Sequence, residues 1–176
     1  MKNIVAISLV VILLGTYSCS KLTTITFYEQ YNQSVTIPQL TGPASADTVS
    51  SPLIATGIAS DLQANNTSSS LVQSVKLQTA TLTITAPSGQ TFGFLQNVRA
   101  FIFTDSLPAV EIANDYNIPS NADTLNLNID AVQLKPYLLS NNFGMRFITV
   151  SNAATTNSMT LKAYLKFQIQ ANLLGL

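Results

Sequence analysis

Hydrophobic and polar residues alternate most regularly near the C-terminal end of the chain. One parity of residues 159–171 is apolar, and the other consists of Thr, Lys, Tyr and Gln. The apolar positions are Met159, Leu161, Ala163, Leu165, Phe167, Ile169 and Ala171. A repeat of two residues is that of a β-strand with one buried face. We therefore expect a single long strand that buries this apolar face within its own chain.

Shorter strand patterns occupy most of the chain before this segment. They are runs of β-branched and aromatic residues bounded by Gly, Pro, Asn or Asp. We expect strands at residues 23–28, 34–37, 54–58, 72–85, 92–104, 110–113, 125–129 and 143–150. A change of parity near Ala80 predicts a β-bulge in the strand at 72–85. The segments 41–51 and 62–70 are rich in turn-forming residues and predict loops.

The pattern changes between residues 125 and 140. From residue 125 to 129, three apolar residues alternate with Asn, which predicts one half-buried strand. The segment 131–140 breaks this alternation, and Pro136 inside it leaves room for at most one or two helical turns.

The pattern as a whole predicts an all-β protein. About seven to nine strands without a long amphipathic helix favour an antiparallel β-sandwich. A closed barrel is the alternative fold. An outer-membrane barrel fits less well, because Pro residues and long polar connections interrupt the alternation between inward and outward positions.

The N-terminal segment has the pattern of an export signal. An apolar run at residues 4–14 follows Lys2, and its eleven residues are too few to span a bilayer, which takes about 20. The run leads to Ser18 and then to Cys19, the only cysteine in the chain. We expect a signal helix within residues 1–18, with an ordinary secretory signal or an uncleaved anchor as alternatives.

The junction at Cys19 resembles the lipobox of bacterial lipoproteins. This resemblance implies that residues 1–18 are removed, that the Cys19 thiol carries acyl chains such as palmitate, and that residues 19–22 form a lipid-anchored start. A single β-sandwich domain at 23–176 would follow. Ser20 stands where Asp favours the inner membrane, and no acidic run follows Cys19. The resemblance therefore implies an outer-membrane lipoprotein that faces the periplasm.

Composition excludes several kinds of chemistry. The 176 residues suit one domain, and 9% of them are charged, against about 25% in typical soluble proteins. Without histidine there is no Ser-His-Asp or Cys-His pair and no imidazole ligand for a metal. Lys and Arg are too few and scattered to indicate a nucleic-acid partner or a patch for anionic lipids. We expect no enzyme activity, no cofactor and no metal.

Carboxylates are the remaining acid or base groups. Five of the eight lie in one stretch: Asp105, Glu111, Asp115, Asp123 and Asp130. Paired carboxylates cleave glycosides, and oxygens from Asp115, Asn117, Asn121 and Asp123 would suit Ca²⁺. Neither hypothesis has a diagnostic spacing, because the loop lacks the glycine and terminal glutamate of a calcium-binding hand. Turn formation is the favoured interpretation of these residues.

Aromatic and arginine residues have more than one interpretation. The phenylalanines at 92, 94, 101 and 103 are expected in the core, with a pocket for an apolar ligand as the alternative. The tyrosines Tyr28, Tyr31, Tyr116, Tyr137 and Tyr164 leave open whether they pack or stack on sugars. Arg99 and Arg146 are expected as outward strand residues, with pairing to a nearby carboxylate as the alternative.

The domain resembles small lipoproteins of Bacteroidota that have an immunoglobulin-like or late-embryogenesis-like β-sandwich. The similar segments are Ser34–Pro38, Val75–Pro87, Thr91–Leu95, Val98–Thr104, Leu134–Tyr137 and the terminal strand. They are packing patterns, so the resemblance implies a fold and a location but no activity.

Three function hypotheses follow. The first is a lipid-anchored, non-enzymatic binding or structural module whose partner is another envelope protein or a glycan. The second is an assembly subunit, because lipoprotein pilins of Bacteroidota, which this chain resembles in signal and fold, exchange strands between subunits. Those pilins are cleaved after an Arg near the start of the mature chain, whereas the first Arg here is Arg99. The third is a carboxylate-dependent enzyme.

Overall fold

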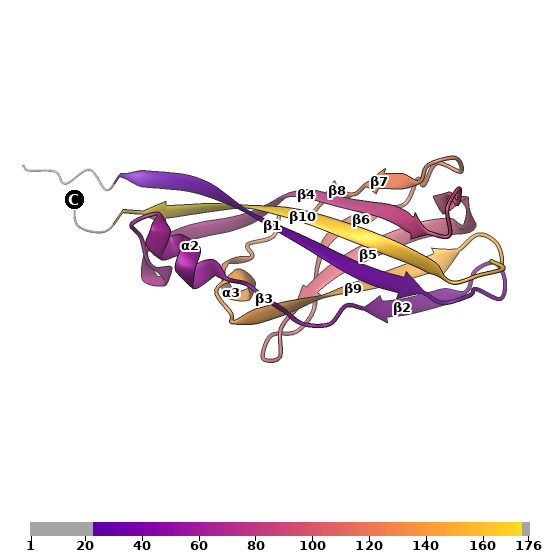
Figure 1. The fold of residues 1–176 in the computed structure, drawn as a ribbon, viewed down its shortest axis with the longest axis horizontal. Helices are drawn as coiled ribbons and strands as arrows, with labels where there is room; N and C mark the ends of the chain where they lie inside the picture. The colour runs from indigo at the N-terminus through magenta and orange to yellow at the C-terminus, as the bar shows by residue number, and fades with distance from the viewer. Residues whose placement is uncertain (1–22, 174–176) are drawn as a thin grey trace, which may run out of the picture.

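Two antiparallel β-sheets packed face to face make up the protein (Figure 1). The computed structural model describes residues 23–173, so the expected signal helix and the lipid-attachment residue Cys19 lie outside the described residues. The ten strands confirm the all-β sandwich, with slightly more strands than the sequence predicts. The core fills the space between the sheets, and its largest fully buried side chains include Phe92, Phe143, Phe147 and Phe167.

The first sheet, called sheet A here, contains the three longest strands. Its order is β1 (Thr24–Ile37), β10 (Met159–Asn172), β4 (Val72–Ala86) and β7 (Thr124–Asn126). Strands β1, β10 and β4 run along the long axis of the molecule (Figure 1). The long C-terminal strand is confirmed: its predicted apolar face is buried along its whole length. Because β10 lies between β1 and β4, both of its edges are paired within its own chain.

A bulge in β4 explains the predicted change of parity. Lys166 of β10 is opposite Thr79, but the next residue, Phe167, is opposite Leu77, so Gln78 is an extra residue. The bulge is confirmed just before Ala80, and it allows Leu77 and Ala80 both to face the core.

The second sheet, called sheet B here, is built from shorter strands. Its order is β2 (Ala46–Ser50), β9 (Asn142–Ser151), β5 (Leu95–Phe103), β6 (Val110–Asp115) and β8 (Asn128–Ile129), with β3 (Ile54–Ala55) pairing with the start of β9. The strands predicted at 92–104, 110–113 and 143–150 are thus confirmed, the first one after a 3-10 turn at Phe92–Phe94 (η3).

The N-terminal part of the chain departs from the sequence prediction. The strands expected at 23–28 and 34–37 are one continuous strand, β1, because Glu29 and Tyr31 continue the inward parity between them. The segment 41–51 was expected as a loop, and this was wrong: it contains β2, an edge strand that pairs with β9. Hydrogen bonds to β9 satisfy backbone groups of β2, so the strand forms although its sequence lacks a regular apolar alternation.

A short helix was also missed. Only two residues of the expected strand at 54–58 are extended, and α2 (Ile58–Ala64) follows Gly57, whose φ is 65°. The helix covers part of the loop predicted at 62–70, which ends in a 3-10 turn at Ser69–Leu71 (η2). Its buried residues are Ile58 and Leu62, one helical turn apart, and this pair is too short a pattern to indicate a helix.

The predicted strand at 125–129 is two strands in different sheets. The chain leaves β7 in sheet A, and the Leu127 amide donates to the Ala80 carbonyl (2.9 Å) before β8 joins sheet B. Leu125 and Leu127 are buried as expected, but Ile129 is 38% exposed. The single helical turn α3 (Lys135–Leu138) agrees with the prediction for 131–140.

Candidate functional site

Three of the candidate polar residues meet on the outer face of sheet B. The Arg99 guanidinium forms an ion pair with Glu111, and its Nε donates to Glu111 Oε2 (2.9 Å). The amide of Asn114 donates to Glu111 Oε1 and to Asp130 Oδ1, both at 3.3 Å. The hydrogen bond to Glu111 raises the pKa of Arg99. These carboxylates therefore hold neighbouring side chains in place.

The loop after β6 uses its Asx residues as turn formers. Asp115 Oδ1 accepts a hydrogen bond from the backbone N–H of Asn117 (2.9 Å), which is the geometry of an Asx turn. The Asp123 carbonyl accepts from Ile84 N (2.9 Å) and so ties the loop to β4. Within residues 23–173, no group of three or more His, Cys, Asp or Glu side chains is arranged to hold a metal ion. Asp105 lies apart from the others, beside an open polar hollow that also includes Ser106 and Asn141.

Only half of the candidate phenylalanines are in the core. Phe92 and Phe94 are buried as predicted. The prediction for Phe101 and Phe103 was wrong, because the inward positions of β5 are taken by residues of the other parity, and both rings lie on the outer face of sheet B. The Arg99 guanidinium lies 5.0 Å from the centre of the Phe101 ring.

On the outer side of β5, Phe103 also packs against a glycine of the neighbouring strand β9. Arg146 lies 5.3 Å from the centre of the Phe103 ring, so both arginines are outward strand residues as expected. The Phe103 ring covers Gly144 on the neighbouring strand, where an added Cβ would lie 2.5 Å from its Cζ. A side chain at position 144 would therefore displace the Phe103 ring.

The five candidate tyrosines have different surroundings. Tyr31 faces the core, packs edge-on against Phe143 with ring centres 4.9 Å apart, and donates its hydroxyl to the Thr56 carbonyl (2.6 Å). The hydroxyl of Tyr137 donates to the Pro108 carbonyl (2.9 Å), whereas Tyr116 is 55% exposed. The remaining two, Tyr28 and Tyr164, lie together with other polar residues on the outer face of sheet A.

The outer face of sheet A combines lysines, tyrosines and amides. We define it by the outward positions Tyr28, Gln30 and Asn32 of β1, Lys162, Tyr164, Lys166, Gln168 and Gln170 of β10, Lys76, Thr79, Thr81 and Thr83 of β4, and Asn126 of β7. The strand register places Tyr28 opposite Gln168 on one side of β10 and Lys76 opposite the same residue on the other. None of these positions is acidic, so this face carries only positive charge.

Cross-strand contacts hold these side chains in place. Ser74 Oγ donates to Gln170 Oε1 (3.0 Å), and Gln78 Nε2 donates to Gln168 Oε1 (3.1 Å). The Lys166 ammonium nitrogen lies 4.4 Å from the centre of the Tyr28 ring. These contacts position Tyr28, Lys166, Gln168 and Gln170 on the face. In the sequence, the only sign of the outer face of sheet A is the alternation of Lys, Tyr and Lys at positions 162, 164 and 166.

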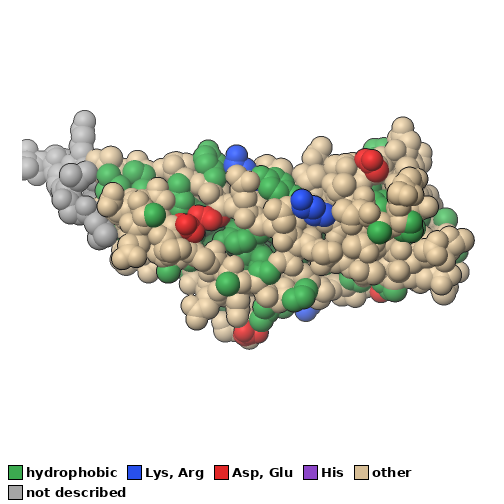
Figure 2. All heavy atoms as spheres, in the orientation of Figure 1, with side chains coloured by type: hydrophobic (Ala, Val, Ile, Leu, Met, Phe, Trp, Pro, Cys, Tyr) green, Lys and Arg blue, Asp and Glu red, His purple; other side chains and the backbone are tan. Residues whose placement is uncertain are grey.

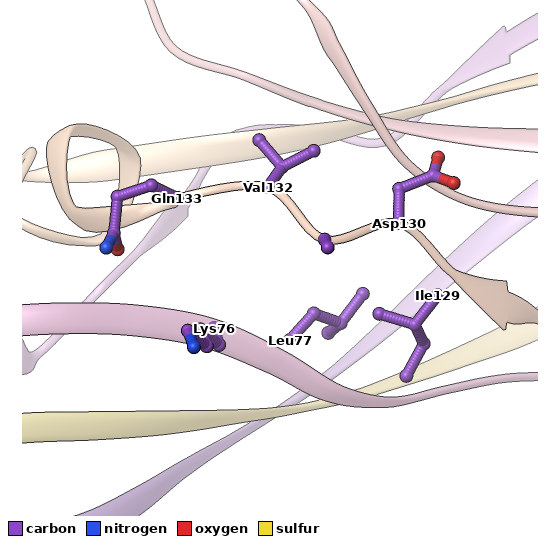
Figure 3. Close-up of a pocket in the computed structure, with 7 residues that line it drawn as sticks. Lys76, Leu77, Ile129, Asp130, Val132 and Gln133 are labelled. Carbon is purple, nitrogen blue, oxygen red and sulfur yellow. The ribbon is translucent and has the colours of Figure 1, made fainter.

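A pocket of about 350 Å³ adjoins this face at the edge of β4 (Figure 3). It is open because the segment that pairs with β4 turns away after Leu127 to form β8 in sheet B. This segment returns to β4 where the Leu134 N–H donates to the Val75 carbonyl (2.9 Å). Its lining residues are Lys76, Leu77, Ile129, Asp130, Ala131, Val132 and Gln133. In Figure 3 the side chains of Leu77 and Ile129 point toward each other, whereas the Asp130 carboxylate points away.

An unexpected pair of carboxyl groups lies where β1 meets α2. Glu29 occupies an inward position of β1, and Asp61 in the first turn of α2 is close enough for its charge to act on Glu29. Burial, followed by the negative charge of Asp61, raises the pKa of Glu29 to about 7. Burial and the same two carboxylates also raise the pKa of the Tyr31 hydroxyl. No local pattern in the sequence predicts this pair, because 32 positions separate its members (61 − 29).

We expect Glu29→Gln to stabilise the protein above neutral pH. A raised pKa in the folded state means that Glu29 contributes stability below its ordinary pKa of 4.5, and that this contribution is lost as pH rises through about 7. Glutamine does not ionise, so the variant does not lose this stability as the pH rises. After discounting for solvent screening of a half-exposed group, the gain at pH 8.5 is about 1 kcal/mol, or roughly 2–4 °C.

Thermal unfolding between pH 4 and 9 measures this effect, with Asp123→Asn as the control for loss of an exposed carboxylate. The wild type and Glu29→Gln should unfold at similar temperatures at pH 4 and should diverge above pH 7. A difference that is the same at every pH would contradict the raised pKa of Glu29.

Comparisons with known proteins give no family. No protein-family model and no curated protein match the sequence. Among solved structures, the chain is similar to a decameric BFDV capsid protein, with 10% identity over 85% of this chain and 99% of that chain and a TM-score of 0.42. It is also similar to FLHE, with 10% identity over 82% and 96% of the two chains and a TM-score of 0.29.

A further match is a carbohydrate-binding module of the β-sandwich superfamily, with 11% identity over 82% of this chain and 56% of that chain and a TM-score of 0.30. The fold assignment rests on the strand pairing of this chain itself. None of the helices between residues 23 and 173 is long and apolar enough to cross a membrane.

Proposed function

We propose that the protein is a lipid-anchored, non-enzymatic binding module of the bacterial envelope, and that the outer face of sheet A is its binding surface. The observation that supports this most directly is the set of tyrosines, lysines and amides that the strand register brings to that face, where Lys166 contacts Tyr28 and Gln168 is held by a hydrogen bond. Tyrosine offers a large rigid contact area, and a side chain that is already held in place binds a partner at a lower entropic cost. The face runs along the longest strands, so an extended partner can contact it over its length (Figure 1).

The remaining polar clusters have structural roles. Glu111 and Asp130 hold Arg99 and Asn114, and Asp115 closes a turn. The visible face in Figure 2 likewise carries only a few separated charged side chains among uncharged polar and hydrophobic atoms. These observations favour binding over acid and base catalysis.

Attachment through Cys19 would place this surface near the membrane. The first strand begins at Thr24, five positions after Cys19 (24 − 19). Five residues span at most about 17 Å. Residues 1–18 would be removed and the acylated chain would lie at the periplasmic side of the outer membrane.

The same fold argues against exchange of the last strand between subunits. An exchanged strand must leave a vacant place in the sheet of its own subunit, but β10 already fills the place between β1 and β4. A self-contained module is therefore the better description.

One fractionation and binding experiment tests the proposal. Cells would express the full chain as wild type, as Cys19→Ala, as the double variant Tyr28→Ala and Tyr164→Ala, and as the control Tyr116→Ala. The wild type should be found in the outer membrane with a lipid-modified N-terminal Cys19 by mass spectrometry, and Cys19→Ala should leave the membrane. The mature wild type in neutral detergent should retain polysaccharide or protein from a washed envelope extract.

The double tyrosine variant should retain at least tenfold less of this material, because each lost ring removes about 1 kcal/mol or more of contact. Tyr116→Ala removes an equally exposed tyrosine from a loop away from the face, so its retention should match the wild type. Equal loss in both variants would exclude the outer face of sheet A as the binding surface. A wild type that keeps Met1 would exclude the anchor.

A further inference from the structure

We propose that the partner of the outer face of sheet A is an acidic polysaccharide with carboxylate groups, laid along β10. This inference rests on the proposed function, because it names the chemical class of the ligand for the same surface.

The first argument is charge. Three lysines from distant parts of the chain, Lys76, Lys162 and Lys166, come together on a face that has no acidic residue. The ion pair of Arg99 and Glu111 is the one salt bridge within residues 23–173, so these lysines are not neutralised by carboxylates of the described chain. In a protein with 9% charged residues, such a one-sided surface attracts a negatively charged partner.

The second argument is the order of side chains along the central strand. Outward residues of β10 follow one another as Lys162, Tyr164, Lys166 and Gln168, with about 6.7 Å between neighbours on the same face. A linear chain of rings along this strand would meet an ammonium group, an aromatic ring, a second ammonium group and an amide in turn. The two lysines are about 13 Å apart, so they suit charges that recur every few sugar rings.

The third argument concerns the apolar and hydrogen-bonding groups beside the lysines. Tyr28 is 49% exposed and Tyr164 is partly exposed, so both offer ring surface on which a sugar can stack. Gln30 and Asn32 are exposed on the adjacent strand, and each amide offers donors and acceptors to vicinal hydroxyl groups. A simple polyanion without rings or hydroxyls would leave these groups unused.

Other anionic partners fit less well. Recognition of anionic lipid headgroups typically relies on a cluster of four to eight basic residues. Here three lysines are spaced along the sheet among uncharged amides and hydroxyls. A protein partner would need a contiguous apolar centre, whereas Tyr28 is the one strongly exposed large apolar side chain on this face of the described residues.

Affinity electrophoresis of the mature acylated chain in neutral detergent tests the inference. The probe is polygalacturonate, a linear polymer of carboxylated sugars, and the matched control probe is the same polymer with its carboxyl groups methyl-esterified. Polyglutamate serves as a carboxylated polymer without sugar rings. Binding to anionic vesicles is compared with binding to neutral vesicles by flotation.

Two triple variants separate charge from the presence of a long side chain. In the first, Lys76, Lys162 and Lys166 are each changed to Gln, and in the second each is changed to Arg. We expect polygalacturonate to retard the wild type at least tenfold more strongly than the esterified polymer or polyglutamate. The Gln variant should lose at least tenfold in affinity, the Arg variant should keep the wild-type affinity, and added salt should weaken binding.

The outcomes separate this inference from the proposed function. If the tyrosine variant loses binding but the Gln variant does not, or if the esterified polymer binds equally well, the face binds a neutral ligand and the acidic class is overturned. Equal binding to polyglutamate would overturn the polysaccharide. Lysine-dependent flotation with anionic vesicles without binding to polygalacturonate would assign the face to the membrane instead.

Discussion

Leu165→Asp is expected to abolish the cooperative unfolding transition of the protein. Leu165 is 2% exposed in the middle of the central strand of sheet A. The substitution removes a core side chain, which costs about 2–5 kcal/mol, and it places a carboxylate in apolar surroundings at a cost of several more. This sum is comparable with the whole stability of a typical domain, about 5–15 kcal/mol.

Lys166→Asp, one residue further along β10, is the matched control. It introduces the same side chain into the same strand, but on the outer face, where it removes the contact with Tyr28. The expected loss is about 1 kcal/mol or less. Circular dichroism during thermal or urea denaturation compares the two variants. Similar losses of stability in both would contradict the strand register.

Deletion of residues 159–176 is expected to unfold the remaining chain completely. It removes the strand that joins β1 to β4 and five large buried side chains, Met159, Leu161, Leu165, Phe167 and Ile169. Burying each such side chain contributes about 1.5–3 kcal/mol. The loss is therefore comparable with the whole stability of a typical domain, about 5–15 kcal/mol, even before the lost strand pairing is counted.

The truncated chain should show no sigmoidal transition in denaturant and no dispersed amide signals by NMR. The control is deletion of residues 174–176 alone, which leaves β10 intact and should preserve the transition. A folded monomer that lacks residues 159–176 would instead support an assembly subunit that exchanges its last strand.

The sequence predicts the strands best where burial repeats every two residues. Strand β10 keeps one register with β1 over 14 residues, and its burial follows the hydrophobic pattern residue by residue. The β-bulge beside Ala80 was also predictable, because an extra residue shifts the apolar parity. Local alternation is thus enough to place strands that have one solvent-exposed face and one buried face.

The errors occur where tertiary pairing overrides the local pattern. Strand β2 is held by hydrogen bonds to β9, and helix α2 is held by two buried residues, Ile58 and Leu62. Phe101 and Phe103 were assigned to the core by residue type, but the parity of β5 places them outside. Hydrophobicity alone does not distinguish the two faces of such a strand.

The candidate surface could not be derived from the sequence. Lys76 is 86 positions from Lys162 (162 − 76), and only the pairing of β4 with β10 brings them to one face. The pair of Glu29 and Asp61 likewise depends on where α2 packs. In both cases the residues meet through tertiary packing, by strand order in the first case and by the place of α2 in the second, and local periodicity encodes neither.

The position of β10 has a consequence for the proposed export. The Thr24 hydroxyl in β1 donates to the Asn172 side chain in β10, across 148 positions, and within residues 23–173 strand β1 pairs with β10 alone. Under the export proposed above, sheet A would remain incomplete until β10 had been synthesised and moved across the membrane. A chain threaded through a secretion channel from its N-terminus would stay open until β10 emerged, and the long-range closure that follows is intrinsically slow.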